Sequence, residues 1–187
     1  MDIINIMIES FHGINPVIAS NAYIAINASI IGDVKIESDV NVWYNSVIRG
    51  DFNTINIGAG SNIQDNSVLH VDVDEPLNIR KKITIGHNCI IHGCKIDNYC
   101  LIGMGSIIMN RVEIGSNCII GAGTLITQNT IILYTIKYEK QLKQSFLPFI
   151  AANHPKVILA RGDNQISVNQ YSEILNEAIH NDNRLKA

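Results

Sequence analysis

Three histidines in the middle of the chain, His70, His87 and His92, are the residues whose type and spacing most directly suggest chemistry. Neutral imidazole nitrogens bind Zn²⁺ at about 2.0–2.1 Å, and a site with three protein ligands keeps a fourth position open for water or substrate. A lone histidine is more often a surface or core residue than a ligand. Whether these three can meet therefore depends on the elements that carry them.

A six-residue repeat of branched aliphatic residues runs through this part of the chain. Eighteen such positions follow one another; fourteen of the seventeen steps between them are six residues long, and the exceptions are nine, ten and five. A period of six fits neither the 3.6-residue period of a helix face nor the simple alternation of a two-faced sheet. A short strand followed by a tight corner explains the period if each aliphatic side chain points inward. The positions are Ile18, Ile24, Ile30, Ile36, Val42, Ile48, Ile57, Ile63, Leu69, Ile79, Ile85, Ile91, Ile96, Ile102, Ile108, Ile114, Ile120 and Ile126.

The repeat fixes where the histidines lie. The hexapeptide pattern resembles that of left-handed parallel β-helix proteins, in which three six-residue sides make one coil. Residues of equal phase in successive coils then stack about 4.7–4.9 Å apart. His70 and His92 each follow an inward aliphatic residue by one position and lie three steps apart, so they stack on one side and can share a metal ion. His87 follows Ile85 by two and lies on the preceding side, where we expect it to reach the site of a neighbouring chain. Three chains around a threefold axis would form three such sites; the alternative is a set of outward polar residues without metal.

Three charged side chains lie close to the histidines in the repeat. Arg49 occupies the column of His70 one coil earlier and Asp51 follows at the corner, so the two are expected to pair across the interface. Asp65 stacks under His87, where a carboxylate can accept the second N–H of a ligand histidine. The alternative for each is an ordinary solvated side chain or surface ion pair.

The stretch 41–122 resembles the gamma-class carbonic anhydrase-like family. The motifs that carry the resemblance are RGD at 49–51, NIQD at 62–65, VLH at 68–70, IGH at 85–87 and IHGC at 91–94. It implies an all-β fold, a left-handed parallel β-helix of hexapeptide repeats, and a homotrimer. It also implies that Zn²⁺ or Fe²⁺ is bound by His70 and His92 of one chain and His87 of the next. Further expectations from the resemblance are an Arg49–Asp51 interface pair, a site-lining Gln64 and a Tyr171 near the metal.

The reaction that the resemblance implies is the reversible hydration of CO₂ to bicarbonate by a metal-bound hydroxide, with Gln64 orienting the nucleophile. Two features depart from active members: Phe52 stands where some have a glutamate, and their acidic loop is reduced here to 71–76. Two alternatives therefore stay open. One is a non-catalytic metal-binding scaffold or assembly subunit. The other is a hydrolase or acyltransferase acting on a CoA thioester, although the loop 72–82 carries no histidine to act as a transferase base.

Composition and charge argue against several other classes. The 187 residues are 47% hydrophobic and 17% charged, which is too apolar for a disordered chain, and the net charge of −3 gives no reason to expect nucleic acid or an anionic membrane as partner. Four cysteines without CxxC spacing favour reduced thiols over a disulfide framework. The N-terminus lacks the Lys and Arg with which a signal peptide begins, so we expect a cytoplasmic protein. We expect an N-terminal segment over 1–17, the β-helix over 18–130 and a tail over 131–187 with an amphipathic helix at about 165–180.

Overall fold

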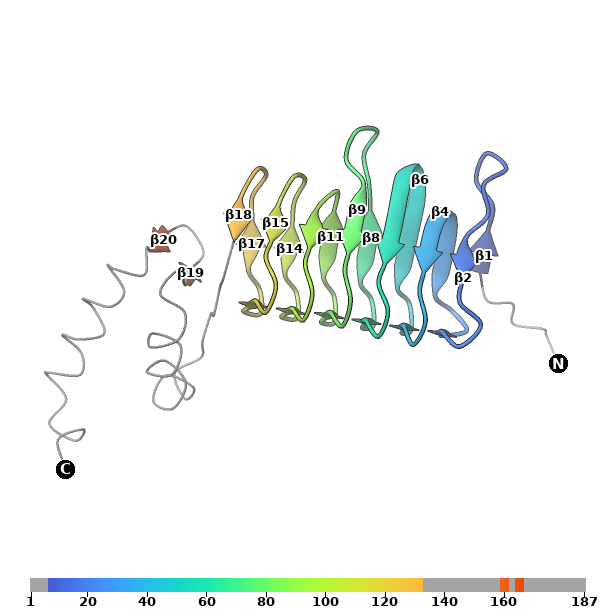
Figure 1. The fold of residues 1–187 in the computed structure, drawn as a ribbon, viewed down its shortest axis with the longest axis horizontal. Coiled ribbons are helices and arrows are strands. Elements are labelled where there is room, and N and C mark those ends of the chain that lie inside the picture. The colour runs from blue at the N-terminus through green and yellow to red at the C-terminus, as the bar shows by residue number, and fades with distance from the viewer. Residues whose placement is uncertain (1–6, 133–158, 162–163, 167–187) are drawn as a thin grey trace, which may run out of the picture.

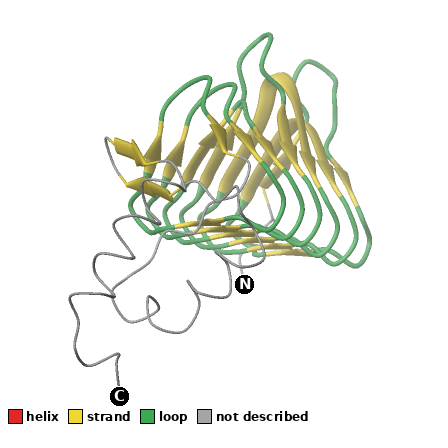
Figure 2. Ribbon diagram, turned by 60° about the vertical axis from the view of Figure 1, so that its left-hand side comes forward, coloured by secondary structure: helices red, strands yellow, loops and turns green. Residues whose placement is uncertain are grey.

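The chain winds into a three-sided solenoid of short parallel strands. The computed structural model describes residues 7–132, 159–161 and 164–166, and in the first of these ranges successive coils stack along one axis (Figure 1). The stacked strands build flat sides that are visible when the molecule is turned (Figure 2). One six-stranded sheet makes one side, and a twelve-stranded sheet makes the other two.

The twelve-stranded sheet bends around one edge of the solenoid. The long strands β4 (Ser29–Ile36) and β6 (Val47–Ile57) each run along both of its sides, and β1 (Met7–Glu9) and β2 (Val17–Ile18) pair with β4. The first part of β6 pairs with β8 and its last part with β9. One side continues through β8 (Val68–His70), β11 (Ile90–His92), β14 (Ile107–Ile108) and β17 (Leu125–Ile126), and is called the histidine side below. The other continues through β9 (Leu77–Ile79), β12 (Lys95–Ile96), β15 (Glu113–Ile114) and β18 (Ile131–Ile132).

The six-stranded sheet closes the third side and is parallel throughout. Its strands are β3 (Tyr23–Ile24), β5 (Asn41–Val42), β7 (Asn62–Ile63), β10 (Thr84–Ile85), β13 (Leu101–Ile102) and β16 (Ile119–Ile120). The parallel β-solenoid of hexapeptide repeats that the six-residue period predicts is confirmed.

The core is the inward column of the repeat. Of the eighteen aliphatic positions, all are buried except Ile18 and Ile24, which belong to the first coil and are partly buried against the cluster. Small residues two positions before many of these aliphatic residues are buried as well, except Ala22 of the first coil, which is partly buried, and the serines among them are hydrogen bonded. Ser67 Oγ donates to the carbonyl of Gly86 at 2.9 Å, and Ser61 Oγ to that of Arg80 at 3.0 Å. Each buried hydroxyl thus satisfies a backbone acceptor of the next coil instead of remaining unpaired.

Two corners of the solenoid flank the histidine side, and they differ. At the regular corner, where the six-stranded sheet meets the histidine side, the five coils from residue 41 onward turn on two residues each: 44–45, 65–66, 87–88, 104–105 and 122–123. The second residue of each has positive φ, between 58° and 68°, and is Asn or Gly, the types that adopt this conformation most readily. At the irregular corner, between the histidine side and the side of β9, the three exceptional steps of the repeat follow one another in successive coils, because Ile48, Leu69 and Ile91 are neighbours in register.

The tail is described only at β19 (Leu159–Arg161) and β20 (Asn164–Ile166), which form an antiparallel pair. The predicted helix at about 165–180 begins where β20 is a strand, and the rest of that range, including Tyr171, lies outside the described residues. Within the described ranges, no helix is long and apolar enough to cross a membrane.

Candidate metal centre

His70 and His92 lie side by side at the end of adjacent strands of the histidine side. The register of β8 and β11 pairs them directly, as the spacing predicts. Nδ1 of His70 is 2.9 Å from Nε2 of His92, and the two ring centroids are 4.9 Å apart. Both rings point outward, because the residue before each, Leu69 and Ile91, fills the core. The strand alternation therefore presents two imidazoles at one edge of the solenoid.

Asp51 lies behind His70. Its Oδ1 is 2.8 Å from His70 Nε2, its Oδ2 forms an ion pair with Arg49 Nη1, and its side chain is only 7% exposed. Burial alone would raise the pKa of this carboxyl, but the hydrogen bond from His70, a backbone N–H and the charge of Arg49 outweigh it, so the pKa is below its ordinary value. The Arg49–Asp51 pair that the sequence predicts across an interface forms here within one chain.

His87 occupies the regular corner, at the opposite end of β11 from His92. Asp65 Oδ2 is 3.0 Å from His87 Nδ1, one coil below, in the stacked position that the repeat predicts. The imidazole of His87 is about half exposed. Because Nδ1 donates its proton to the carboxylate, Nε2 keeps its lone pair and is free to bind outside the chain.

The paired histidines fit a metal ion by the chemistry of their donors. Two nitrogens that bind one Zn²⁺ at 2.0–2.1 Å lie at most about 4 Å apart, and the 2.9 Å between His70 and His92 is within this limit. Asp51 provides the carboxylate that ligand histidines commonly contact. Within the described part of a single chain, no three His, Cys, Asp or Glu side chains are placed to hold a metal. A metal ion at this position would thus have two histidine ligands from the described part of one chain, His70 and His92.

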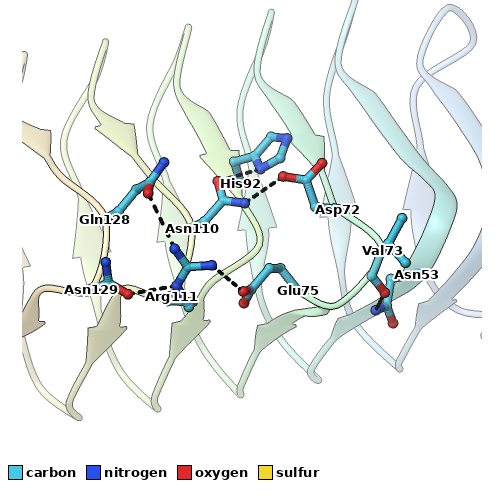
Figure 3. A network of polar contacts seen from close by, with 9 residues as sticks. All are labelled: Asn53, Asp72, Val73, Glu75, His92, Asn110, Arg111, Gln128 and Asn129. Carbon is cyan, nitrogen blue, oxygen red and sulfur yellow. Dashed lines mark hydrogen bonds and ion pairs between the residues drawn. The ribbon is translucent and has the colours of Figure 1, made fainter.

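A short loop at the irregular corner stands next to the pair and is bonded on several sides. The loop 71–76, between β8 and β9, projects beyond the neighbouring corners (Figure 1). Figure 3 shows its contacts: Asn110 Nδ2 donates to Asp72 Oδ2 at 2.7 Å, and Arg111 Nη1 to Glu75 Oε1 at 2.6 Å. On the other flank, Asn53 Nδ2 donates to the carbonyl of Val73 at 2.7 Å.

The contacts of the remaining predicted site residues indicate less about their chemical role. Gln64 precedes the regular-corner turn of its coil; its carbonyl accepts a hydrogen bond from Ser46 Oγ at 2.9 Å, and its side chain is half-buried. Phe52 is largely exposed, with its ring centroid 6.3 Å from that of His70. Sequence reasoning missed Asn110 and Arg111, which follow a regular step of the repeat. The one available signal was the step of five at Ile91–Ile96, which leaves room for another segment at this corner.

Comparisons with known proteins identify relatives with the same hexapeptide repeat. A family profile described as bacterial transferase hexapeptide (six repeats) matches residues 15–50 and 93–128. The chain is 40% identical over 123 residues to gamma carbonic anhydrase 1, mitochondrial, of Arabidopsis thaliana, covering 63% of this chain and 45% of that protein. It is 47% identical over 109 residues to the carbonic anhydrase of Geobacillus kaustophilus, covering 58% and 60%. The chain thus spans about half the length of these curated relatives.

Among solved structures, the hexapeptide transferase family protein from Anaplasma phagocytophilum superimposes with a TM-score of 0.69 at 30% sequence identity. The match covers 94% of this chain and 93% of that protein.

Proposed function

This chain belongs to the hexapeptide-repeat β-helix family that includes proteins named gamma carbonic anhydrase, and on that premise we propose that it is a metal-dependent, gamma-class carbonic anhydrase-like protein. The proposed reaction is the reversible hydration of CO₂ at a site shared by two chains of a homotrimer. Left-handed winding of the solenoid and a cytoplasmic location, both expected from the sequence, are part of the proposal.

The observation that carries the proposal is the paired arrangement of His70 and His92, with ring nitrogens 2.9 Å apart and Asp51 behind the first ring. Zn²⁺ or Fe²⁺ held there would lower the pKa of a water molecule toward neutrality and so supply a nucleophile for CO₂. Asp51 accepts the N–H of His70 and fixes the orientation of that ring. Gln64 would orient the nucleophile, and Tyr171 would lie near the metal, as the family resemblance implies.

The third ligand would be His87 of a neighbouring chain. In support, Asp65 holds the Nδ1 side of His87, which leaves Nε2 directed away from its own coil. The histidine side also carries an outer apolar ladder that is 38% to 52% exposed, consisting of Val68, Ile90, Ile107 and Leu125. These residues are neighbours in register and lie two positions before the metal-ligand column. A contiguous apolar stripe of this kind favours burial against another protein surface, and a second copy of the chain would bring His87 with it.

A second candidate function is a non-catalytic metal-binding scaffold or assembly subunit. Two of the acidic side chains of loop 71–76 are engaged within the chain: Asp72 accepts from Asn110, and Glu75 is paired with Arg111. Phe52 offers no proton-accepting group at the other flank of His70. Rapid CO₂ hydration needs a group that carries a proton from the site to solvent, so these two observations favour slow or absent turnover.

Stopped-flow CO₂ hydration on protein of measured metal content tests the proposal. We expect about one metal ion per chain, and hydration that is lost together with the metal when His70 is replaced by alanine. Metal content that stays at the wild-type level in His70→Ala would reject the site. Metal binding without hydration would favour the scaffold function.

A further inference from the structure

Asn110 connects the metal-ligand pair to the loop at the irregular corner. Its Oδ1 is 2.9 Å from His92 Nδ1, and its Nδ2 donates to Asp72 Oδ2 at 2.7 Å. Figure 3 shows the amide between the imidazole and the carboxylate, with one end directed at each. The first contact joins neighbouring coils, but the second does not belong to the repeat, because Asn110 is the first residue of a corner turn two coils beyond the strand that leads into the loop.

The chemistry of the three groups fixes the direction of every hydrogen bond. An ionised carboxylate only accepts, so the NH₂ group of Asn110 must face Asp72. The carbonyl oxygen of the amide then faces His92, and it also only accepts. His92 therefore has to carry its proton on Nδ1. This assignment does not depend on how the amide was oriented, because the reversed amide would place an oxygen against the carboxylate.

The same reasoning applies at the other end of the pair. His70 Nε2 lies 2.8 Å from Asp51 Oδ1, an acceptor, so the proton of His70 is on Nε2. In the neutral rings, the two facing nitrogens, His70 Nδ1 and His92 Nε2, are then both unprotonated. Two lone pairs 2.9 Å apart repel each other unless a cation lies between or beside them.

We propose that Asn110 is a positioning residue for the metal centre: held in direction by Asp72, it keeps the proton of His92 on Nδ1 and so presents Nε2 as a ligand. The assignment rests on the proposed metal site, and it adds residues that do not touch the metal. It also gives the loop 71–76 a role, because Asp72 orients Asn110.

The fold provides the space for this connection at one residue. Gly93 lies in the shortened corner, with φ of 43°, and a Cβ there would meet Cβ of Glu75 at 2.8 Å and Nδ2 of Asn110 at 3.4 Å. The step of five thus lets the loop fold over the corner until it reaches the following coil. Arg111, next to Asn110, makes a separate bond to Glu75 on the same loop. Loop anchoring and ligand orientation can therefore be separated by mutation.

Four proteins make the test: the wild type, Asn110→Leu, the exchange variant Asn110→Asp with Asp72→Asn, and Arg111→Met. The exchange variant keeps both hydrogen bonds and reverses the direction of one. The new amide at position 72 donates to the new carboxylate at position 110, which still accepts from His92. Arg111→Met is the matched control, since it loses an anchor of the same loop without touching His92. The readout is the dissociation constant for Zn²⁺, measured by competition with a chromophoric chelator, after circular dichroism has verified the fold of each variant.

We expect Asn110→Leu to bind Zn²⁺ about 10- to 100-fold more weakly, which is typical for loss of a group that orients a ligand histidine. The exchange variant and Arg111→Met should stay within about threefold of the wild type. Wild-type affinity in Asn110→Leu would overturn the inference, as would an equal loss in Arg111→Met, which would assign the effect to loop anchoring. An exchange variant as weak as Asn110→Leu would also overturn it.

A measurement on metal-free protein separates this inference from the proposed function. Nitrogen-15 NMR of histidine side chains, recorded well above the ordinary imidazole pKa of about 6.5, reports which nitrogen carries the proton. The signals of His92 are identified by their loss in His92→Gln. We expect the proton on Nδ1 in the wild type and a mixture of tautomers in Asn110→Leu. If the wild type binds no Zn²⁺, the proposed function fails while this result still decides the role of Asn110; a proton on Nε2 in the wild type would refute that role.

Discussion

The two corners that flank the histidine side are built by opposite rules. At the regular corner five successive coils use the same two-residue turn with an Asn or Gly at positive φ. At the irregular corner, three successive coils use steps of nine, ten and five residues, and the extra residues of one coil occupy the space that the short coil leaves. Both corners nevertheless lie over the same fully buried aliphatic columns.

The difference shows which part of a repeat protein can acquire chemistry of its own. A regular hexad fixes each outward side chain in a column, where it can only contact its counterparts one coil above and below. His87 over Asp65 is such a contact, and it needs nothing more than the column. Asn110 lies one coil beyond His92, but Asp72 comes from the coil before His92 and must reach Asn110 from the side, which requires a break in the period. Asn110 and Asp72, 38 residues apart, meet only at such a break.

The largest expected effect concerns the division of the site between the two corners. His87→Ala chains retain His70 and His92, and chains with both His70→Ala and His92→Ala retain His87. We expect each variant alone to bind almost no metal, whereas mixed trimers formed by co-expression should contain some complete sites. Metal per trimer, after mixed trimers have been verified by mass spectrometry, is the measurement.

This experiment tests whether the regular corner contributes a metal ligand. Mixed trimers that hold no more metal than the two parents would show that the three histidines do not meet across an interface. His12→Ala serves as the control, because His12 belongs to the first coils, away from both corners' histidines, and should leave the metal content unchanged.

Truncation of a core side chain should destabilise the protein equally beneath both corners. Ile91 lies under the irregular corner and Ile102 in the six-stranded sheet, and both are completely buried. Truncation of either to alanine should lower the free energy of unfolding by about 2–5 kcal/mol, measured by denaturant titration. A loss below about 1 kcal/mol for Ile91→Ala alone would mean that the break in the repeat loosens the core beneath it.

Replacing one glycine at each corner should change the stability of the protein by an intermediate amount. Gly105 at the regular corner has φ of 68°, and a Cβ added there would meet no atom within 4 Å, whereas Gly93 at the irregular corner faces Glu75. Gly105→Ala should cost about 1–2 kcal/mol, from the left-handed conformation alone. Gly93→Ala should cost about 1–3 kcal/mol more, because the added methyl group overlaps the loop. Equal melting temperatures of the two variants would contradict the close packing of the loop on this corner.

The smallest effect is expected on the inward side of the irregular corner. Burial raises the pKa of the Cys94 thiol above its ordinary value of 9.0. The unfolded chain therefore loses this proton above pH 9 while the folded chain keeps it, so the stabilisation is complete below pH 9 and declines as the pH rises further. The free energy of unfolding of the wild type should fall more steeply than that of Cys94→Ala, by up to about 1.4 kcal/mol per pH unit. Identical slopes above pH 9 would indicate that water reaches this corner.

The sequence alone predicts what depends on the column. The inward aliphatic residues, the pairing of His70 with His92, and the position of Asp65 under His87 all follow from counting steps of the repeat. Each of these contacts joins residues of equal phase, so no knowledge of a loop path is needed.

Contacts at the irregular corner could not be derived in this way. The path of a loop of six residues is not set by its period, so Asn110 and Arg111 gave no sign that they reach Asp72 and Glu75. Arg49 and Asp51 pair within one chain because they lie two positions apart on β6, and their place at a subunit interface stays a prediction. The repeat also does not specify which metal or substrate such a site would bind, because neither is part of the chain.

The contacts of Asn110 and Arg111 also impose an order in time. In a solenoid each coil docks mainly on the one before it, and the backbone hydrogen bonds between coils join residues about 16 to 23 positions apart, so folding can proceed coil by coil. The bonds from Asp72 and Glu75 span 38 and 36 residues. During synthesis, the strands that carry His70 and His92 can therefore pair before the residues that hold His92 have emerged, and the ligand pair acquires its fixed orientation only one coil later.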